Sequence, residues 1–108
     1  MSAISTHVLD TAQGRPAHGV PVRLEHGDGR VIGQAVTNTD GRIRDLGPQK
    51  VPAGAYRLVF GTASYFASTG QQGFFPEVTI TFTVDDATQH YHVPLLLSPY
   101  AYSTYRGS

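Results

Sequence analysis

The sequence predicts a mainly β protein, an antiparallel sandwich or barrel of short strands. The clearest evidence is the segment 78–84, where valine, isoleucine, phenylalanine and valine alternate with three threonines. A period of two is typical of a strand with one apolar and one polar face. Several such segments follow one another, separated by turn residues and without long amphipathic helical periods. That arrangement favours two packed antiparallel sheets or a closed barrel.

Three further strand-like segments precede this one in the chain. Residues 20–25 and 56–60 alternate apolar and polar side chains, and residues 31–37 form a more apolar segment of strand length. Gly, Pro, Asn and Asp residues mark turns between the segments, at 27–29, 38–41, 47–48 and 52–54.

A short helix is expected at only one place, residues 62–70. Ala63, Phe66 and Ala67 would share one face of that helix. In the turn that precedes residue 42, Gly41 is expected to adopt a positive φ, which glycine tolerates at little cost.

The segment 90–97 predicts a C-terminal strand with two different faces. Its odd-numbered residues are apolar or aromatic and form the natural core face, because side chains alternate along a strand. The opposite face carries His90, His92, Pro94 and Leu96. This second face is too apolar for open solvent and too polar for the interior of a sandwich. We therefore expect it at a contact between subunits, with a pocket in it.

Composition bounds the size of the protein and its partners. The chain has 108 residues, 40% of them hydrophobic, and a formal net charge of +0 with His neutral. These values suit a single domain over residues 1–108 with a modest core. Neither a basic stripe nor a basic amphipathic helix is present, so a nucleic-acid or membrane partner is not expected. A small, roughly neutral ligand is favoured instead.

The sequence contains no cysteine, which excludes disulfides and thiolate metal ligands. Its first residues lack the basic and apolar regions of a signal peptide, and no apolar run approaches the length needed to cross a bilayer. A cytoplasmic protein is therefore expected.

Five segments, taken in order along the chain, carry a family resemblance. They are Ser5-Thr6-His7-Val8-Leu9-Asp10, Thr39-Asp40-Gly41-Arg42, Phe74-Phe75-Pro76-Glu77, His-Tyr-His-Val-Pro-Leu-Leu-Leu-Ser at 90–98, and Tyr105-Arg106-Gly107-Ser108. Together they resemble the 5-hydroxyisourate hydrolases, the enzyme branch of the transthyretin-like family. The resemblance runs from about Ile4 to the last residue. The terminal tetrapeptide separates these hydrolases from the hormone-carrying transthyretins.

The resemblance implies a two-sheet antiparallel sandwich of the transthyretin type with one short helix. It implies a homotetramer, a dimer of dimers, with active sites in clefts between the dimers. The implied reaction is the hydrolytic opening of the six-membered ring of 5-hydroxyisourate, which gives 2-oxo-4-hydroxy-4-carboxy-5-ureidoimidazoline in urate degradation. No cofactor and no metal are implied.

The resemblance also assigns His7, Arg42 and His92 to the active site, together with the terminal tetrapeptide. Ring opening needs a base that takes a proton from water, and a neutral imidazole suits this role near pH 7. Either His7 or His92 could be that base. Arg42 is expected to bind the substrate and stabilise the developing oxyanion, because its planar fork suits oxygen-rich groups.

Within the tetrapeptide, Tyr105 is expected to contact the substrate. Ser108, through its hydroxyl or its carboxylate, is expected to orient a histidine or a water molecule. The sequence has no Gly-x-Ser-x-Gly nucleophile motif, so direct attack by an activated water is favoured over an acyl-enzyme.

Other interpretations apply to the same residues taken singly. The spacing of His90 and His92 also suits a zinc site, although two polar residues at a strand edge are the more common case. Arg42 after an Asp-Gly turn is ordinarily a solvated residue. His18 and His26 match no family position and are expected to have no role.

Two other functions would also fit a sandwich of this size. One is a non-catalytic transthyretin-like carrier of a small hydrophobic molecule, and the other is an adhesion or carbohydrate-binding module. A hydrophobic channel has no use for His7, Arg42, His92 and the tetrapeptide, so the sequence favours the hydrolase.

Overall fold

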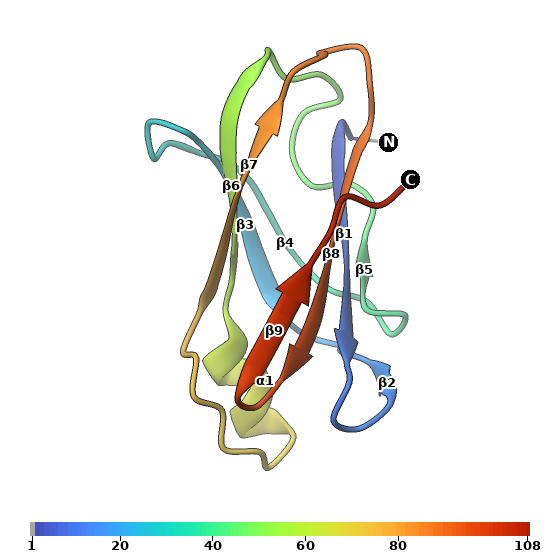
Figure 1. Ribbon diagram of the computed structural model, residues 1–108, viewed down its shortest axis with the longest axis vertical. Coiled ribbons are helices and arrows are strands. Elements are labelled where there is room, and N and C mark those ends of the chain that lie inside the picture. Colours follow the sequence, from blue (N-terminus) through green and yellow to red (C-terminus); the bar gives the residue numbers. More distant parts are fainter. Residues whose placement is uncertain (1) are drawn as a thin grey trace.

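Two β-sheets face each other across one core (Figure 1). The computed structural model describes residues 2–108. The five-stranded sheet has the order β2-β1-β8-β9, with β5 also paired to β1. Its strands are β1 (Ile4–Asp10), β2 (Arg15–Pro16), β5 (Arg42–Ile43), β8 (Tyr91–Ser98) and β9 (Ala101–Thr104). The four-stranded sheet has the order β4-β3-β6-β7, formed by β3 (Pro21–His26), β4 (Val31–Val36), β6 (Gly54–Phe60) and β7 (Val78–Val84).

The fold therefore confirms the predicted mainly β sandwich. β7 coincides with the segment 78–84, and the other strand-like segments correspond to β3, β4, β6 and β8 within one or two residues. Side chains from both sheets meet between them, and Leu24, Leu58 and Leu95 are fully buried there. Burial of such side chains is the main favourable term in folding.

The expected short helix is also confirmed, as α1 (Thr62–Ser68), which follows β6 at the lower end of the sandwich in Figure 1. Its buried face differs from the expected one. Tyr65 and Phe66 are buried, whereas Ala63 and Ala67 are exposed. The two aromatic side chains remove far more apolar area from water than two alanines, so they determine which face packs inward.

A buried carboxylate ties α1 to the first strand. Asp10 accepts hydrogen bonds from the Tyr65 hydroxyl at 2.5 Å, from the Gln71 side-chain amide at 3.1 Å and from the Gln13 backbone N–H at 3.0 Å. Burial acts to raise the pKa of Asp10, but these donors outweigh it and hold that pKa below its ordinary value. The carboxylate is thus ionised, and its hydrogen bonds join β1 to α1 and the residues that follow it.

One strand pair departs from the antiparallel pattern. β1 and β8 run parallel, with Ser5 opposite His92, His7 opposite Pro94 and Leu9 opposite Leu96. The reason is topological, because these strands stand near opposite ends of the chain and no hairpin joins them. The pairing brings the first and last histidine-bearing segments of the chain side by side.

The turn at 38–42 sets the position of β5. Gly41 has a φ of 74°, as expected, and a Cβ at this position would lie 2.4 Å from the Val8 carbonyl oxygen. The Asn38 side-chain oxygen accepts hydrogen bonds from the backbone N–H groups of Asp40 and Arg42, both at 2.9 Å. Only glycine allows the turn to approach β1 this closely, and β5 then pairs with β1.

Three short strands, β2, β5 and β9, were not expected from the sequence. β2 and β5 have two residues each, too few for a periodic pattern. β9 has four exposed residues, so its polar and aromatic side chains show no apolar face. Within residues 2–108, no helix is long and apolar enough to cross a membrane.

Candidate active site

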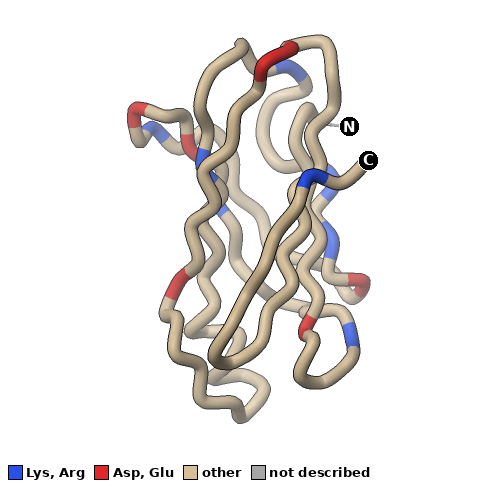
Figure 2. The backbone as a smooth tube through the Cα atoms, in the orientation of Figure 1, with Lys and Arg blue, Asp and Glu red and all other residues tan. Residues whose placement is uncertain are grey.

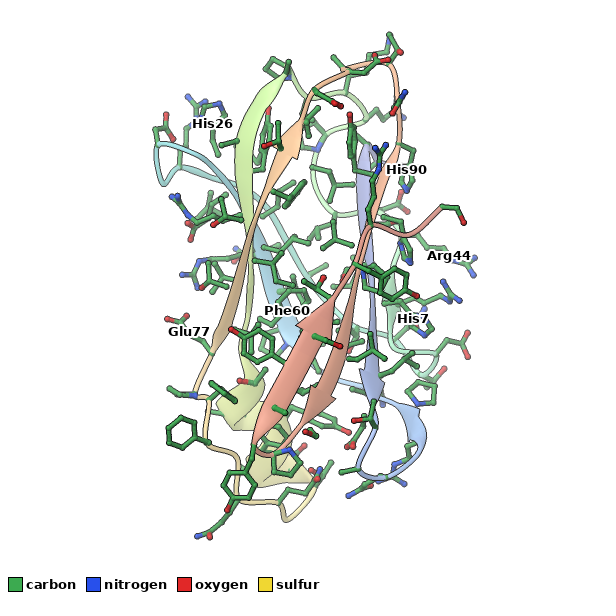
Figure 3. All side chains as sticks on the ribbon, in the orientation of Figure 1. His7, His26, Arg44, Phe60, Glu77 and His90 are labelled. Carbon is green, nitrogen blue, oxygen red and sulfur yellow. The ribbon has the colours of Figure 1, made fainter. Side chains whose placement is uncertain are left out.

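The site residues lie on the outer face of the five-stranded sheet, away from the core. The odd-numbered residues of β8 are buried, as predicted, so the even-numbered ones point outward. The parallel register places Ser5 beside His92 on this outer face, and the antiparallel register of β5 places Arg42 beside His7. Figure 3 shows His7 and His90 on this side of the sheet, with Arg44 projecting between them.

A cleft of about 270 Å³ opens on this face. Its lining brings together residues that are far apart in the sequence: Ser5, Thr6, Arg42, Ile43, Arg44, His90, His92 and Ser108. Figure 2 shows basic segments on this side of the molecule. A cleft with basic and imidazole groups suits a small, oxygen-rich substrate.

The cleft contains three of the four residues assigned to catalysis, namely Arg42, His92 and Ser108. The fourth, His7, stands beside it, paired in register with Arg42 and hydrogen-bonded to the backbone of Asp40. The structure therefore brings all four into one region.

Burial lowers the pKa of His92, and the positive charge of Arg42 and the neighbouring His7 and His90 lower it further. Burial and Arg42 also lower the pKa of His7, while the backbone and charge of Asp40 act in the opposite direction. Both imidazoles are consequently neutral at pH 7, which is the state that a general base requires.

The sequence reasoning missed Ser5 and gave no role to His90. The Ser5 Oγ lies 2.8 Å from the His90 Nε2 and 2.8 Å from the His92 Nδ1. The His90 Nδ1 lies 3.0 Å from the backbone oxygen of Ser2. Ser5 belongs to a segment that carries the family resemblance, but its link to His92 depends on the pairing of β1 with β8.

The end of the chain packs directly on His92. The Gly107 N–H donates a hydrogen bond of 2.8 Å to the His92 backbone oxygen. A Cβ on Gly107 would lie 2.5 Å from the His92 Cδ2, so only glycine fits against the ring. The preceding Arg106 stacks on the Tyr91 ring at 4.4 Å and donates to the Gln89 side-chain oxygen at 2.8 Å. These contacts carry Ser108 into the cleft.

Within the single chain, the structure does not bring Tyr105 into the cleft. Its side chain is 58% exposed and lines a different hollow, between β7 and the end of β9. Tyr105 and Arg106 follow the end of β9, where strand alternation no longer applies, and both line this hollow together with Tyr91. A contact of Tyr105 with substrate stays a prediction.

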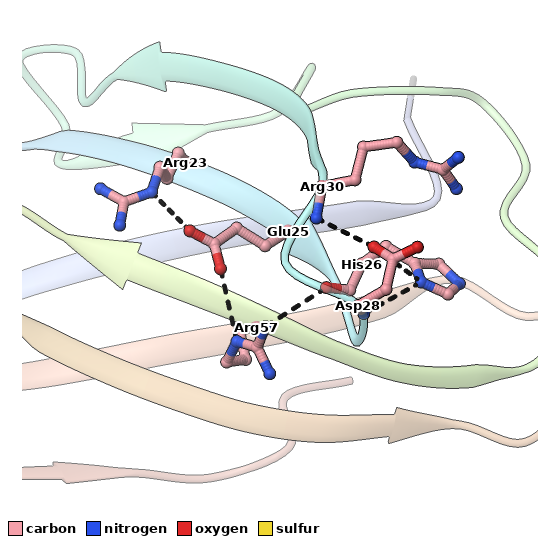
Figure 4. A network of polar contacts seen from close by, with 6 residues as sticks. All are labelled: Arg23, Glu25, His26, Asp28, Arg30 and Arg57. Atoms are coloured by element: carbon pink, nitrogen blue, oxygen red, sulfur yellow. Dashed lines mark hydrogen bonds and ion pairs between the residues drawn. The ribbon is translucent and has the colours of Figure 1, made fainter.

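Histidines outside the cleft serve other contacts. His26 lies on the four-stranded sheet beside Asp28, near the ion pairs of Glu25 with Arg23 at 2.6 Å and Arg57 at 3.3 Å (Figure 4). His18 lines a hollow between β2 and α1. In the described part of the chain, no three His, Cys, Asp or Glu side chains are grouped so as to hold a metal ion.

Replacing Gly107 with valine is expected to lower turnover about 100-fold or more while leaving the fold intact. The added side chain must displace either the His92 ring or Ser108, and a shift of about 1 Å at a reacting group costs roughly that factor. Steady-state kinetics and circular dichroism would measure the two effects. Thr79→Val, which adds an exposed valine to β7 on the other sheet, serves as the control. Unchanged kinetics in Gly107→Val would show that the terminal tetrapeptide has no part in catalysis.

The fold and the cleft together define a class of protein: β sandwiches that carry histidine and arginine side chains in a cleft on the outer face of one sheet. The model of the HIUase/Transthyretin family matches residues 4–107, so the chain belongs to this family. It is 51% identical to "5-hydroxyisourate hydrolase 2" of Rhizobium meliloti, over 97% of this chain and 95% of that protein. It is 44% identical to the "5-hydroxyisourate hydrolase" of Mus musculus, over 99% and 96%.

Solved structures give the same picture. The 5-hydroxyisourate hydrolase of Klebsiella pneumoniae superimposes with a TM-score of 0.89 at 41% identity, covering 97% of this chain and 98% of that one. Sea bream transthyretin in complex with thyroxine also gives 0.89, at 32% identity, covering 97% and 94%. The backbone is thus common to hydrolase and carrier, and the side chains of the cleft must distinguish them.

Proposed function

We propose that this protein hydrolyses 5-hydroxyisourate to 2-oxo-4-hydroxy-4-carboxy-5-ureidoimidazoline, a step of urate degradation. The observation that carries the proposal is the cleft in which His92, Arg42 and Ser108 meet. Relatives named as 5-hydroxyisourate hydrolases, at 42–51% identity over nearly the whole chain, support the same activity. The carrier alternative leaves these polar residues without a purpose.

In the proposed mechanism, water attacks a carbonyl carbon of the six-membered ring. Neutral His92 takes a proton from this water, and negative charge develops on the carbonyl oxygen. Arg42 binds the substrate, and its N–H groups donate hydrogen bonds to that oxygen. The C–N bond then breaks, and the protonated imidazole returns its proton to the departing nitrogen. Base assistance of this kind contributes about 10²–10⁴-fold to the rate.

The other site residues support these two. His7, beside Arg42, is assigned to substrate binding and to the stabilisation of the attacked ring. Ser108 lies in the cleft, where its hydroxyl can hold the water or the substrate. No covalent intermediate is needed, because every proton transfer has an acceptor within the cleft.

The direct test is to add fresh 5-hydroxyisourate to the purified protein and follow the loss of its ultraviolet absorbance. We expect decay well above the rate in buffer, unchanged by a chelator, because imidazole, guanidinium and hydroxyl groups suffice for the proposed steps. Heat-denatured protein serves as the control. Decay equal to that in buffer, or activity that a chelator abolishes and zinc restores, would overturn this proposal.

The activity is expected to depend on pH through His92. Its pKa lies below the ordinary 6.5, and a base works only when unprotonated. kcat/KM should therefore stay level through neutral pH and fall only below 6.5, as the imidazole gains a proton. In Arg42→Gln one cause of the lowered pKa is absent, so the acidic limb should move to higher pH. A rate that rises as the pH falls would contradict the assignment of a base.

We further propose that the chain assembles as a homotetramer through the outer face of the five-stranded sheet. Leu9 and Leu96 are neighbours on this face and remain partly exposed in the single chain. A second copy seated there would exclude water from the adjacent cleft. The cytoplasmic location expected from the sequence stays a prediction.

Leu96→Glu is expected to dissociate tetramers into dimers and to lower activity to the same degree, since it places a charge in an apolar contact. Sedimentation velocity, combined with the ultraviolet assay, measures both effects. Thr81→Glu adds the same charge to an exposed position of β7 and serves as the control. A dissociated Leu96→Glu variant with full activity would disprove the link between assembly and catalysis.

A further inference from the structure

A chain of hydrogen bonds leads from the backbone of Ser2 to the imidazole of His92. The Ser2 carbonyl oxygen contacts the His90 Nδ1 at 3.0 Å, and the His90 Nε2 contacts the Ser5 Oγ at 2.8 Å. The same oxygen of Ser5 contacts the His92 Nδ1, also at 2.8 Å. All three distances are those of good hydrogen bonds.

The first member of this chain fixes the direction of every other bond. A carbonyl oxygen can only accept a hydrogen bond, so the His90 Nδ1 must carry a proton and donate the hydrogen bond to the Ser2 oxygen. In neutral His90 the Nε2 then carries no proton, so it accepts a hydrogen bond from the Ser5 hydroxyl. Because that hydroxyl has a single proton, its oxygen must accept from the His92 Nδ1. The proton of neutral His92 is therefore on Nδ1.

We propose that Ser5 and His90 are positioning residues that hold His92 in the Nδ1–H tautomer and leave the lone pair of Nε2 to receive a proton from water. The inference rests on the proposed function for its catalytic meaning. It also chooses between the two candidate bases that the sequence left open, in favour of His92.

The surroundings of His92 support this arrangement. Ser5 is only 7% exposed, so bulk water does not compete freely for its hydroxyl. Gly107 covers the Cδ2 edge of the ring and limits its rotation. Among residues 2–108, no hydrogen bond engages the His92 Nε2, whereas Nδ1 is engaged by Ser5. Nε2 is thus the nitrogen left for the cleft.

The side chains that surround His90 are basic or uncharged. Arg42 and Arg44, from β5 and the residues after it, line the cleft together with His90. On its other side, His90 shares a hollow with Lys50, Gln49 and Gln89. No Asp or Glu side chain of the described residues lines either space. A second proton on His90 would reverse the bonds, turn the Ser5 hydroxyl toward His92 and place the His92 proton on Nε2, which removes the base.

The tautomer can be measured without substrate. Long-range proton–nitrogen correlation spectra of ¹⁵N-histidine-labelled protein, recorded at pH 8, distinguish Nδ1–H from Nε2–H imidazoles. We expect both His90 and His92 to be Nδ1–H in the unaltered protein, with His92 becoming a mixture of tautomers in Ser5→Ala. A His92 that carries its proton on Nε2 in the unaltered protein would overturn the proposal.

Kinetics supply the catalytic readout. Ser5→Ala is expected to lower kcat about tenfold with little change in KM, as the loss of one orienting hydrogen bond predicts. Ser5→Thr keeps a hydroxyl and should restore most of kcat. Ser64→Ala removes an exposed hydroxyl of α1 that donates to the Gly61 backbone oxygen, far from the histidines, and it serves as the control. Equal kcat in Ser5→Ala and the unaltered protein would overturn the positioning role.

A double-mutant cycle tests whether His90 acts through Ser5. His90→Phe keeps a planar ring but removes both nitrogens, so the Ser5 hydroxyl loses its acceptor and is free to donate to His92. We expect the double variant Ser5→Ala/His90→Phe to be no slower than the slower single variant. Fully additive losses would show that His90 contacts substrate independently, against the proposal.

These measurements separate failure of the inference from failure of the proposed function. If the unaltered protein does not hydrolyse 5-hydroxyisourate, the proposed function fails, and the tautomer spectra still decide the structural claim. If hydrolysis occurs but His92 is Nε2–H, the inference alone fails.

Discussion

Replacing His92 with asparagine is expected to lower kcat by about 10²–10⁴-fold, the usual contribution of a general base. The asparagine amide can donate to the Ser5 Oγ in place of the imidazole Nδ1, so that the hydrogen bond at 2.8 Å has a substitute. What it lacks is a basic nitrogen at the position of Nε2. The fold should remain, because the His92 side chain lies on the outer face of β8 and contributes nothing to the core.

Steady-state kinetics on fresh 5-hydroxyisourate, with circular dichroism as the check on folding, would measure this effect. The matched control is His26→Asn, which alters a partly exposed histidine on the four-stranded sheet, far from the cleft. A folded His92→Asn variant with kcat within threefold of the unaltered protein would exclude His92 as the base. The role would then pass to His7, the other imidazole beside Arg42.

Arg42→Lys is expected to lower turnover about 10²–10³-fold, although it keeps the positive charge. Loss of one donor to a developing oxyanion has roughly that cost. An ammonium group is a point charge and cannot present the planar pair of N–H groups that a guanidinium offers to an oxygen-rich ring. The backbone of β5 should be unaffected, because the Asn38 side chain and the pairing with β1 hold it in place.

The comparison of Arg42→Lys with Arg42→Gln separates charge from geometry. If both variants lose activity equally, the planar fork is what matters, and if lysine retains most of the activity, Arg42 supplies only diffuse charge. Arg23→Lys, in the ion pair with Glu25 on the other sheet, should leave turnover unchanged and serves as the control.

Local sequence determined most of the strands of this protein and the character of their faces. The alternation over 78–84 is complete enough to predict β7 residue by residue, and the two faces of 90–97 are as the alternation requires. Such signals are visible because a strand exposes its period of two wherever one face is buried. The turn at Gly41 was equally predictable, since the residues at 38–41 are typical of a turn and glycine tolerates the positive φ of 74° found there.

Family resemblance identified the individual residues His7, Arg42, His92 and Ser108, but not how they meet. The cleft exists because β1 pairs in parallel with β8, which joins residues more than eighty positions apart in the chain. No local pattern encodes such a partner, because a strand edge can pair with any strand of compatible length and faces. Ser5 was missed for this reason, as its hydroxyl gains a role only when His90 and His92 stand beside it.

Tyr105 is a residue that the sequence identified but whose position it could not predict. Its presence in the terminal tetrapeptide could be read from the sequence, whereas its place depends on how the chain continues after β9, into a hollow that it shares with Arg106 and Tyr91. Sequence by itself thus determined which elements form, which faces are apolar and which reactive residues are present. Tertiary structure alone decided the parallel pairing, the hydrogen-bond direction at His92 and the path of the chain's end, because each depends on contacts between segments distant in sequence.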